Sequence, residues 1–236
     1  MDELIRAYSV QLFVLMFRRS LFSRLVPLLV LGAVALTFTS LAWAQSVGRA
    51  SGDFPNLRVN KSETPFGRLV ADALLAKSGA DCALINAGSL KSGTLSEGPI
   101  ESTDLEALLS FSDDDVATLS LSGAQLKAAL ERAASVFPTG SPAFLQVAGI
   151  KARFDSNQAP GKRISSISVR GKQLDDGATY SVAMPSSLAE GAAGFFNIWN
   201  GAQKRSTGAS LMQDLIAYIG SKGDVAPDMQ ARFDGA

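Results

Sequence analysis

The sequence predicts an α+β fold, in which mixed sheets pack against helices, and three observations support this class. Apolar residues recur at spacings of three and four over residues 66–74, as on the buried face of a helix. Apolar and polar residues alternate over 116–121, as in a half-buried strand. The predicted helices and strands follow one another without a regular β-α-β alternation, which favours α+β over a doubly wound parallel sheet.

The first half of the expected domain has clear start signals for its elements. Thr64 and Pro65 are typical of an N-cap and of the first position of a helix, and they precede the apolar pattern that begins at Phe66. The continuous apolar run at 82–85 predicts a buried strand over 81–85. Residues 103–109 predict a short helix, with an acid near its start that suits the helix dipole.

The second half predicts one capped helix, three strands and a final helix. Ser122 and Gln125 form a capping box ahead of "LKAALERAA", so a helix is expected there. Three strands are expected, at 144–154, 164–169 and 179–184, with turns at "APGK" and "LDDG" between them. A last helix is expected at 211–219.

The first 44 residues predict an export signal. Three arginines (Arg18, Arg19 and Arg24) precede the uncharged stretch 25–44, which ends in Ala42-Trp43-Ala44. This pattern predicts a secretory signal peptide cleaved after Ala44, and Met16 is a second candidate for the start. The alternative is an uncleaved membrane anchor, because twenty apolar residues are long enough to cross a bilayer. In either case we expect the rest of the chain outside the cytoplasm, in the periplasm or secreted.

The remainder divides into a linker and one domain. Residues 45–56 are small and polar, which indicates a linker, and residues 57–236 are expected to form a single domain. Hydrophobic residues make up 47% of the chain, which is enough for a core.

Charge and residue usage exclude several functional classes. Removing the four arginines and two acids of residues 1–44 leaves 18 basic and 20 acidic residues, a balance that predicts no nucleic-acid partner. The chain has no histidine, which excludes Ser-His-Asp and Cys-His catalysis and the usual zinc sites. We therefore expect no metal and no cofactor.

The single cysteine, Cys82, lies in an apolar run and is expected to be buried and inert.

Six segments taken together resemble the C-terminal, substrate-specificity domain of 5'-nucleotidases. They occur in the family's order and read "ETPFGRLVADAL", "GADCALINAGSLKSGTLSEGPI", "LSLSGAQLKAALE", "FLQVAGIKARFD", "PGKRISSISVRGKQLD" and "YSVAMPSSLAEGAAGFF". The resemblance implies a hydrolase family in which a separate N-terminal metallophosphatase domain binds two metal ions through His and Asp. The C-terminal domain grips the nucleotide and delivers it by a hinge rotation. We expect this chain to be a stand-alone C-terminal domain that is not catalytic by itself.

The resemblance places part of a nucleotide site in the segment "NAGSLK". In the family an Asn, two or three small residues and an Arg contact the nucleotide; here Asn86 and Gly88 match, and Lys91 replaces the Arg. Small residues allow backbone N–H groups to approach an anion, and a cation completes such a cradle. Lysine keeps the charge but loses the bidentate fork of arginine. The alternative is that Gly88 only turns the chain and that Lys91 is a solvated surface charge.

The rest of the implied site is degenerate. The family sandwiches the base between two Phe side chains, of which the first maps to Phe144 and the second to Ser187, which cannot stack. An Asp that accepts the ribose hydroxyls is replaced by Ala193, ahead of the turn's aromatic residue, Phe195. The lost stack is worth about 1–3 kcal/mol and the lost hydrogen bond about 1.5–3 kcal/mol. The alternative role of Phe144 is that of an ordinary core side chain.

These observations predict an exported protein, related to nucleotide catabolism, that binds a nucleotide-like or other anionic small molecule. A separate metallophosphatase chain is a candidate partner, and contact with a membrane is expected only if the N-terminal segment stays uncleaved. The alternative is a non-catalytic envelope protein with a structural or protein-binding role. An autonomous hydrolase is the third reading and the one that the sequence favours least.

Overall fold

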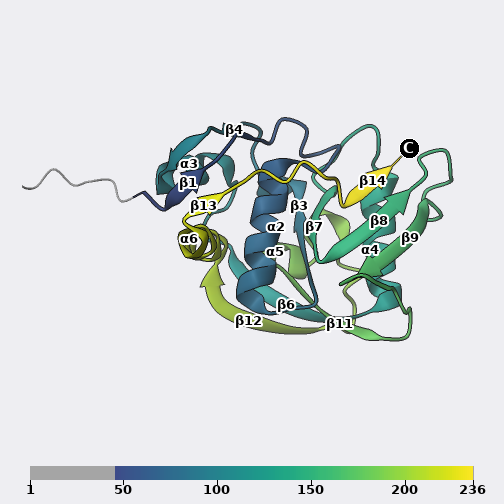
Figure 1. Cartoon of the computed structure of the whole chain (residues 1–236). Coiled ribbons are helices and arrows are strands. Elements are labelled where there is room, and N and C mark those ends of the chain that lie inside the picture. The colour runs from purple at the N-terminus through teal and green to yellow at the C-terminus, as the bar shows by residue number, and fades with distance from the viewer. Residues whose placement is uncertain (1–45, 236) are drawn as a thin grey trace, which may run out of the picture. The chain divides into compact units, whose positions relative to one another are not determined.

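A mixed five-stranded sheet forms the centre of the structure (Figure 1), which is a computed structural model describing residues 46–235. Its strand order is β12-β6-β11-β3-β7. Only β3 and β11 pair in parallel; the other neighbours are antiparallel. In that order the strands span Gln203–Ser210, Asp115–Ser122, Thr179–Pro185, Cys82–Asn86 and Leu145–Ala148. The mixed sheet with its packed helices confirms the α+β prediction. The predicted signal peptide lies outside the described residues.

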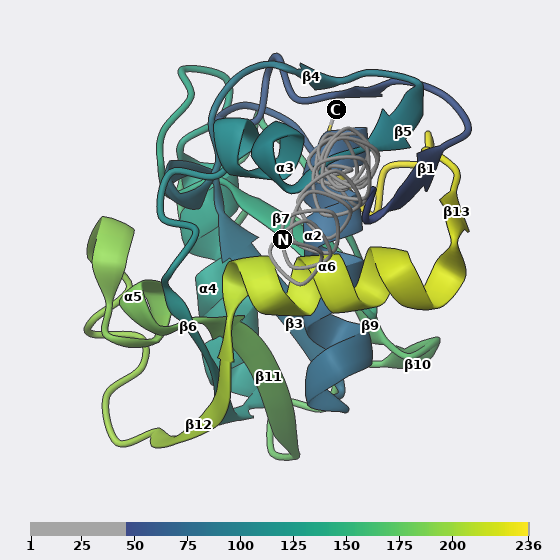
Figure 2. The same cartoon turned by 90° about the vertical axis from the view of Figure 1, so that its left-hand side faces the viewer.

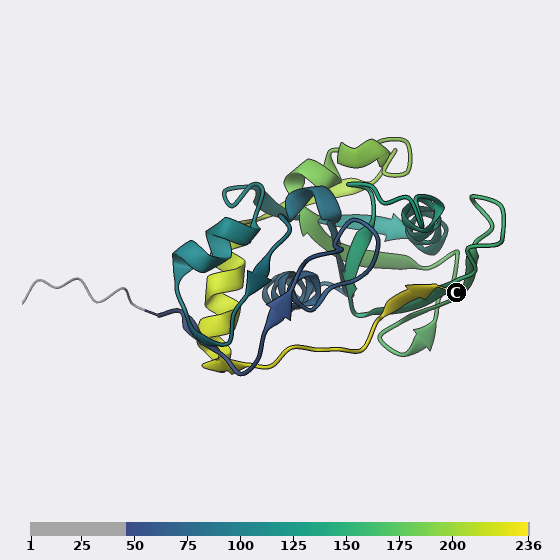
Figure 3. The same cartoon turned by 90° about the horizontal axis from the view of Figure 1, so that it is seen from above.

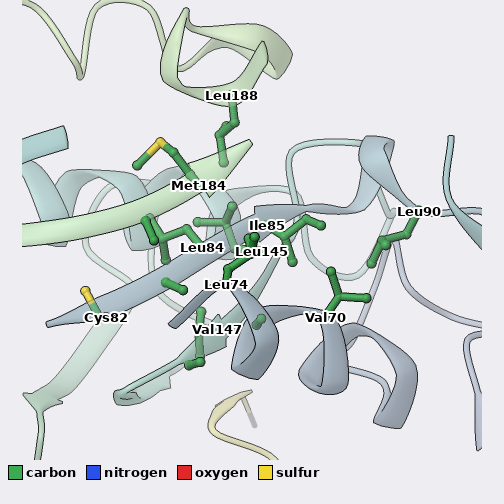
Figure 4. Close-up of a cluster of buried hydrophobic side chains, with 14 of the residues drawn as sticks. Val70, Leu74, Cys82, Leu84, Ile85, Leu90, Leu145, Val147, Met184 and Leu188 are labelled. Atoms are coloured by element: carbon green, nitrogen blue, oxygen red, sulfur yellow. The ribbon is translucent and has the colours of Figure 1, made fainter. Parts of the chain in front are cut away.

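Helix α2 (Pro65–Ser78) begins where the sequence predicts. The Thr64 hydroxyl accepts the N–H of Gly67 at 3.1 Å, and Pro65 occupies the first helical turn. The helix ends at Gly79, whose φ of 66° is the left-handed conformation that glycine adopts without strain. Val70 and Leu74 point from α2 into the apolar cluster around β3 and β7 (Figure 4).

The other helices confirm the remaining predictions to within a turn. The capping box before α4 (Gly123–Ser135) is present: Ser122 Oγ accepts the N–H of Gln125 at 3.2 Å, and Gln125 Oε1 accepts the N–H of Ser122 at 3.0 Å. The short helices α3 and α5 span Ser102–Leu108 and Ser186–Ala189, and α6 spans Leu211–Lys222. Helices α2 and α6 lie on one side of the sheet, and α4 and α5 lie on the other (Figure 3).

The single strand expected at 144–154 is two strands in different sheets. β7 ends at Ala148, and β8 (Ile150–Phe154) joins a second sheet with the order β10-β9-β8-β14. Its other strands span Lys172–Gln173, Ile164–Val169 and Phe233–Gly235. Gly149 makes the break with a φ of 73°, and a side chain there would lie 2.7 Å from the carbonyl oxygen of Asp81. The close approach of two backbones therefore explains why a glycine separates the strands.

The expected linker at 45–56 is instead part of the domain. β1 (Gly48–Ala50) pairs with β5 (Gly98–Ile100) and β13 (Asp224–Val225), and Figure 2 shows these three strands side by side. β2 (Phe54–Pro55) pairs with β4 (Thr94–Leu95). Ala50 and Phe54 are buried. These strands are too short for alternation to be visible in the sequence, which is why the linker prediction was wrong.

A buried ionic network ties the last strand to α2. The Glu63 carboxylate accepts N–H bonds from Val147 at 3.3 Å, from Phe233 at 2.8 Å and from Arg232, and Arg68 Nη1 lies 3.8 Å from it. Burial raises the pKa of Glu63, although the backbone N–H groups and Arg68 act in the opposite direction. We call these residues the Glu63 network.

The Arg232 guanidinium extends this connection. It donates to both oxygens of Asp72 on α2, at 2.6 and 2.8 Å, and to Asp228 at 2.9 Å. These bonds raise the pKa of Arg232, against the effect of burial. The C-terminal segment is thereby attached to α2 by charge-assisted hydrogen bonds, which are the stronger kind.

Candidate functional site

The loop after β3 carries the predicted nucleotide contacts and begins at Asn86. Asn86 is buried, and both ends of its amide are engaged within the protein: Oδ1 accepts from Ser89 Oγ at 2.9 Å, and Nδ2 donates to the Pro142 carbonyl at 3.3 Å. The 3₁₀ turn Ala87–Ser89 follows directly. Asn86 therefore holds the turn against the segment before β7, and its contribution to a ligand site is to shape the loop.

Gly88 is required by the same close packing. A side chain at this position would meet Asn86 Nδ2 at 3.0 Å and Pro142 Cβ at 3.1 Å, which is tighter than side-chain contacts normally are. Its N–H donates to the Pro142 carbonyl at 3.1 Å. Gly88 thus allows the turn to lie flat against Pro142.

The loop does not offer the expected cradle of free N–H groups. The N–H of Ala87 donates to Phe144 at 2.8 Å, that of Leu90 to Ala87 at 3.1 Å, and that of Lys91 to Leu108 at 2.8 Å. With the bond from Gly88, four of the N–H groups that the prediction relied on are already satisfied. The side chain of Lys91 is the cation that this loop offers to an anion.

Lys91 is exposed and lies beside a second segment that carries an exposed aromatic ring. An isolated antiparallel bridge pairs Leu90 with Leu109, and the N–H of Ser110 donates to Ser89 at 2.9 Å. The next residue, Phe111, has 60% of its surface exposed. Within residues 46–235, none of the ion pairs involves Lys91. We call the exposed side chains of these two residues the Lys91–Phe111 surface.

Phe144, the predicted first half of the base clamp, has its ring in the core. The ring has no exposed surface and stacks on Phe233, with centroids 5.4 Å apart. Because both faces are covered by protein, a base has no access to this ring in the structure. The sequence reading missed Phe111, and the signal that separates the two residues is local. Phe144 leads into an apolar strand, whereas Phe111 is followed by Ser112 and three acids.

Ser187, at the position of the second Phe of the clamp, is held by an acid from the turn after Phe111. Asp114 accepts the Ser187 hydroxyl at 2.5 Å and its N–H at 3.2 Å. Asp114 is partly buried and accepts this N–H at the start of α5. Ser187 therefore lies beside Asp114, in the turn that follows Phe111.

The turn at 191–196 is held from α4 and provides no acceptor side chain. Arg132 donates from Nε to the Ala193 carbonyl at 2.9 Å and also from Nη2. Phe195 is fully buried, stacks on Trp199 with centroids 5.3 Å apart, and has Arg132 over its ring at 5.4 Å. Phe195 is thus a core residue that anchors the turn, and Arg132 is a supporting residue that the sequence alone did not indicate.

Two further expectations concern reactive groups. Cys82 is buried, and burial raises the pKa of its thiol to about 12, so the nucleophilic thiolate is scarce at neutral pH, in agreement with the inert thiol that was predicted. Within residues 46–235, no three His, Cys, Asp or Glu side chains are grouped so that they could hold a metal ion.

Comparison with known proteins identifies a family of matching sequences. The family described as "5'-nucleotidase, C-terminal domain" matches residues 46–200. A 5'-nucleotidase-related protein of Glossina morsitans morsitans is 31% identical over 79% of this chain and 37% of its own length. A snake venom 5'-nucleotidase of Naja atra is 28% identical over 72% of this chain and 36% of its own length. The chain thus spans little more than a third of these relatives.

Solved structures share the fold over most of the chain. The 5'-nucleotidase precursor of Thermus thermophilus superimposes with a TM-score of 0.76 at 27% identity, covering 87% of this chain and 42% of that one. The NAD nucleotidase of Haemophilus influenzae superimposes with a TM-score of 0.72 at 21% identity, covering 82% of this chain and 38% of that one.

Proposed function

We propose, from the fact that the chain belongs to the 5'-nucleotidase C-terminal domain family, that it binds a phosphorylated, nucleoside-like ligand at the Lys91–Phe111 surface. The observation that carries the proposal is that an exposed cation, Lys91, and an exposed aromatic ring, Phe111, lie on two chain segments that pair with each other. The two segments are joined by the bonds from Lys91 to Leu108 and from Ser110 to Ser89. An ammonium group attracts phosphate, and a Phe ring stacks on bases with little selectivity among them.

The same residues make the proposed site weak and permissive. Lys91 offers a point charge instead of a planar fork. The Ser187 hydroxyl is bonded to Asp114, and Ala193 has no side-chain acceptor for a ribose. With one stack and one charge contact, we expect dissociation constants in the millimolar range.

We further propose that this domain holds its ligand and that hydrolysis is supplied by a metallophosphatase unit, with a separate chain as the candidate. Two-metal phosphoester hydrolysis needs a cluster of metal ligands, and residues 46–235 group none. The purified chain with Mn²⁺ should therefore release no phosphate from AMP. Phosphate release that persists through repeated purification would overturn this part of the proposal.

Export is the third part of the proposal. The support is the basic, apolar and A-x-A pattern of residues 18–44 and the resemblance to a venom enzyme, which is a secreted type of protein. Within residues 46–235, no helix combines the length and the hydropathy needed to cross a bilayer. N-terminal sequencing of the protein from its native cells should find Gln45 as the first residue; a chain that begins at Met1 or Met16 would contradict cleavage.

Replacing either residue of the surface should weaken AMP binding. Lys91→Ala should weaken it about 10- to 100-fold, because a charge-assisted contact is lost. Phe111→Ala should weaken it about 5- to 100-fold through the lost stack and leave the affinity for inorganic phosphate unchanged. The measurement is titration calorimetry with AMP, adenosine and phosphate.

An exposed residue elsewhere provides a matched control. Lys162→Ala removes the same charge as Lys91→Ala and should not change AMP affinity. If wild type binds neither AMP nor phosphate at millimolar concentration, the binding proposal fails. The alternative of a non-catalytic structural or protein-binding role would then be the better account.

A further inference from the structure

The second sheet has an open polar face with a hollow of about 850 Å³ above it. Strands β8, β9 and β10 form the floor, and the C-terminal segment 228–234 forms one wall. The side chains that matter for ligand chemistry are Lys151, Arg153, Ser166, Ser168, Gln173 and Asp234. None of these residues belongs to the Lys91–Phe111 surface. We call this hollow the β8–β9 groove.

On the side of β9 and β10, strand register places only neutral residues beside the cations of this groove. Along β8 the buried residues Ile150, Ala152 and Phe154 alternate with the exposed Lys151 and Arg153. On β9, Lys151 lies opposite Ser168, and Arg153 lies opposite Ser166. Beyond Ser168, the next strand presents Gln173. Exposed sheet faces gain stability from opposite charges at such cross-strand positions, and on β9 serines occupy both.

Most of the other charged side chains of the groove already form ion pairs. Arg170 lies 3.7 Å from Asp81, and Arg232 is bonded to Asp72 and to Asp228. Asp234 is in register with Arg153, yet no ion pair forms between them within 4.0 Å, and Asp234 Oδ1 accepts the N–H of Gly235. Among residues 46–235, no hydrogen bond or ion pair holds the head group of Lys151 or of Arg153. Within the described residues, the groove therefore holds two cations without an ion pair, Lys151 and Arg153, and one acid without an ion pair, Asp234.

We propose that the β8–β9 groove binds a small anion that carries at least two phosphate groups. Lys151 and Arg153 are two residues apart on one strand, so their Cα atoms are about 7 Å apart. This spacing suits two anionic groups of one molecule better than a single phosphate. The Arg153 fork binds one phosphate in bidentate fashion, Lys151 binds the next as a point charge, and Ser166 and Gln173 donate further hydrogen bonds.

The test is titration calorimetry of the full chain with tripolyphosphate and with inorganic phosphate. Wild type should bind tripolyphosphate at least tenfold more tightly than phosphate, and the double variant Lys151→Ser/Arg153→Ser should lose at least tenfold in tripolyphosphate affinity. The matched control is Lys162→Ser/Lys172→Ser, which removes two charges from the same sheet and its turn. Lys172 precedes Gln173 on β10 and does not line the groove.

Each outcome decides for or against the groove. Retained affinity in the control and lost affinity in the double variant, with unchanged thermal unfolding of both, supports the proposal. Equal losses in both double variants would show non-specific attraction and overturn it, as would equal affinity of wild type for phosphate and tripolyphosphate. If the binding is lost in Lys91→Ala and retained in the Lys151→Ser/Arg153→Ser variant, the groove is not the site. That last result would leave the proposed function of the Lys91–Phe111 surface standing.

Discussion

Glu63→Ala should lower the free energy of unfolding by about 3–5 kcal/mol, which is the usual effect of breaking a buried ion pair. Without the carboxylate, the buried Arg68 side chain loses the opposite charge of Glu63. The N–H groups of Phe233 and Arg232 lose their hydrogen-bond acceptor. The last strand would keep its pairing with β8 and the bonds of Arg232 to Asp72 and Asp228. The measurement is urea unfolding followed by circular dichroism, with Glu97→Ala as the control at an exposed position.

The effect of Glu63→Ala should also depend on pH, with a sign set by the raised pKa of Glu63. A carboxyl group whose pKa is raised by folding stabilises the native state most when it is protonated, below its ordinary pKa of 4.5. That stabilisation declines as the pH rises through the folded-state pKa. The difference between wild type and Glu63→Ala should therefore be larger at about pH 4 than at about pH 8. A loss below about 1 kcal/mol at both pH values would contradict the assigned role of the Glu63 network.

Phe144→Ala should also lower the free energy of unfolding by about 3–5 kcal/mol, because it leaves a cavity in a closely packed core. The ring is fully buried and stacks on Phe233, which itself packs on Phe154 with centroids 5.1 Å apart. Phe111→Ala removes the same group from an exposed position and should change stability by less than about 1 kcal/mol. Thermal and urea unfolding of the two variants provide the comparison.

The same pair of variants separates the two interpretations of the aromatic site. If Phe111 is the stacking residue, Phe111→Ala loses AMP affinity and keeps its stability. If Phe144→Ala instead retained full stability and lost AMP binding, the assignment of the ring to the core would be wrong. The clamp position indicated by the family resemblance would then be the correct one.

Local signals explain which parts of the fold the sequence predicts. Thr64-Pro65 and the Ser122–Gln125 capping box act within one turn of chain, so the starts of α2 and α4 are visible in the sequence and are confirmed. Strand β12 has no apolar alternation, because its residues at the sheet edge are mostly exposed. The break at Gly149 depends on the approach of Asp81, which is distant in the sequence, and so it was missed.

The candidate site is predictable only in part for a related reason. The sequence identifies the turn after β3 and its cation, since small residues followed by Lys91 form a local pattern. Whether the N–H groups of the turn are free depends on Pro142, Phe144 and Leu108, which reach the loop through tertiary contacts. Likewise, the packing of Phe144 on Phe233 joins residues far apart in the sequence, whereas the acids after Phe111 are a local sign of its exposure.

The central claim is that Lys91 and Phe111, on two paired chain segments, form a weak nucleotide-binding surface, and an NMR titration with AMP tests it most directly. Backbone amide shifts of the ¹⁵N-labelled chain should change progressively at millimolar AMP for residues 86–91 and 108–111. Residues of the β8–β9 groove should respond less to AMP than to tripolyphosphate. Shifts that avoid residues 86–91 and 108–111, or no shifts at all, would contradict the claim.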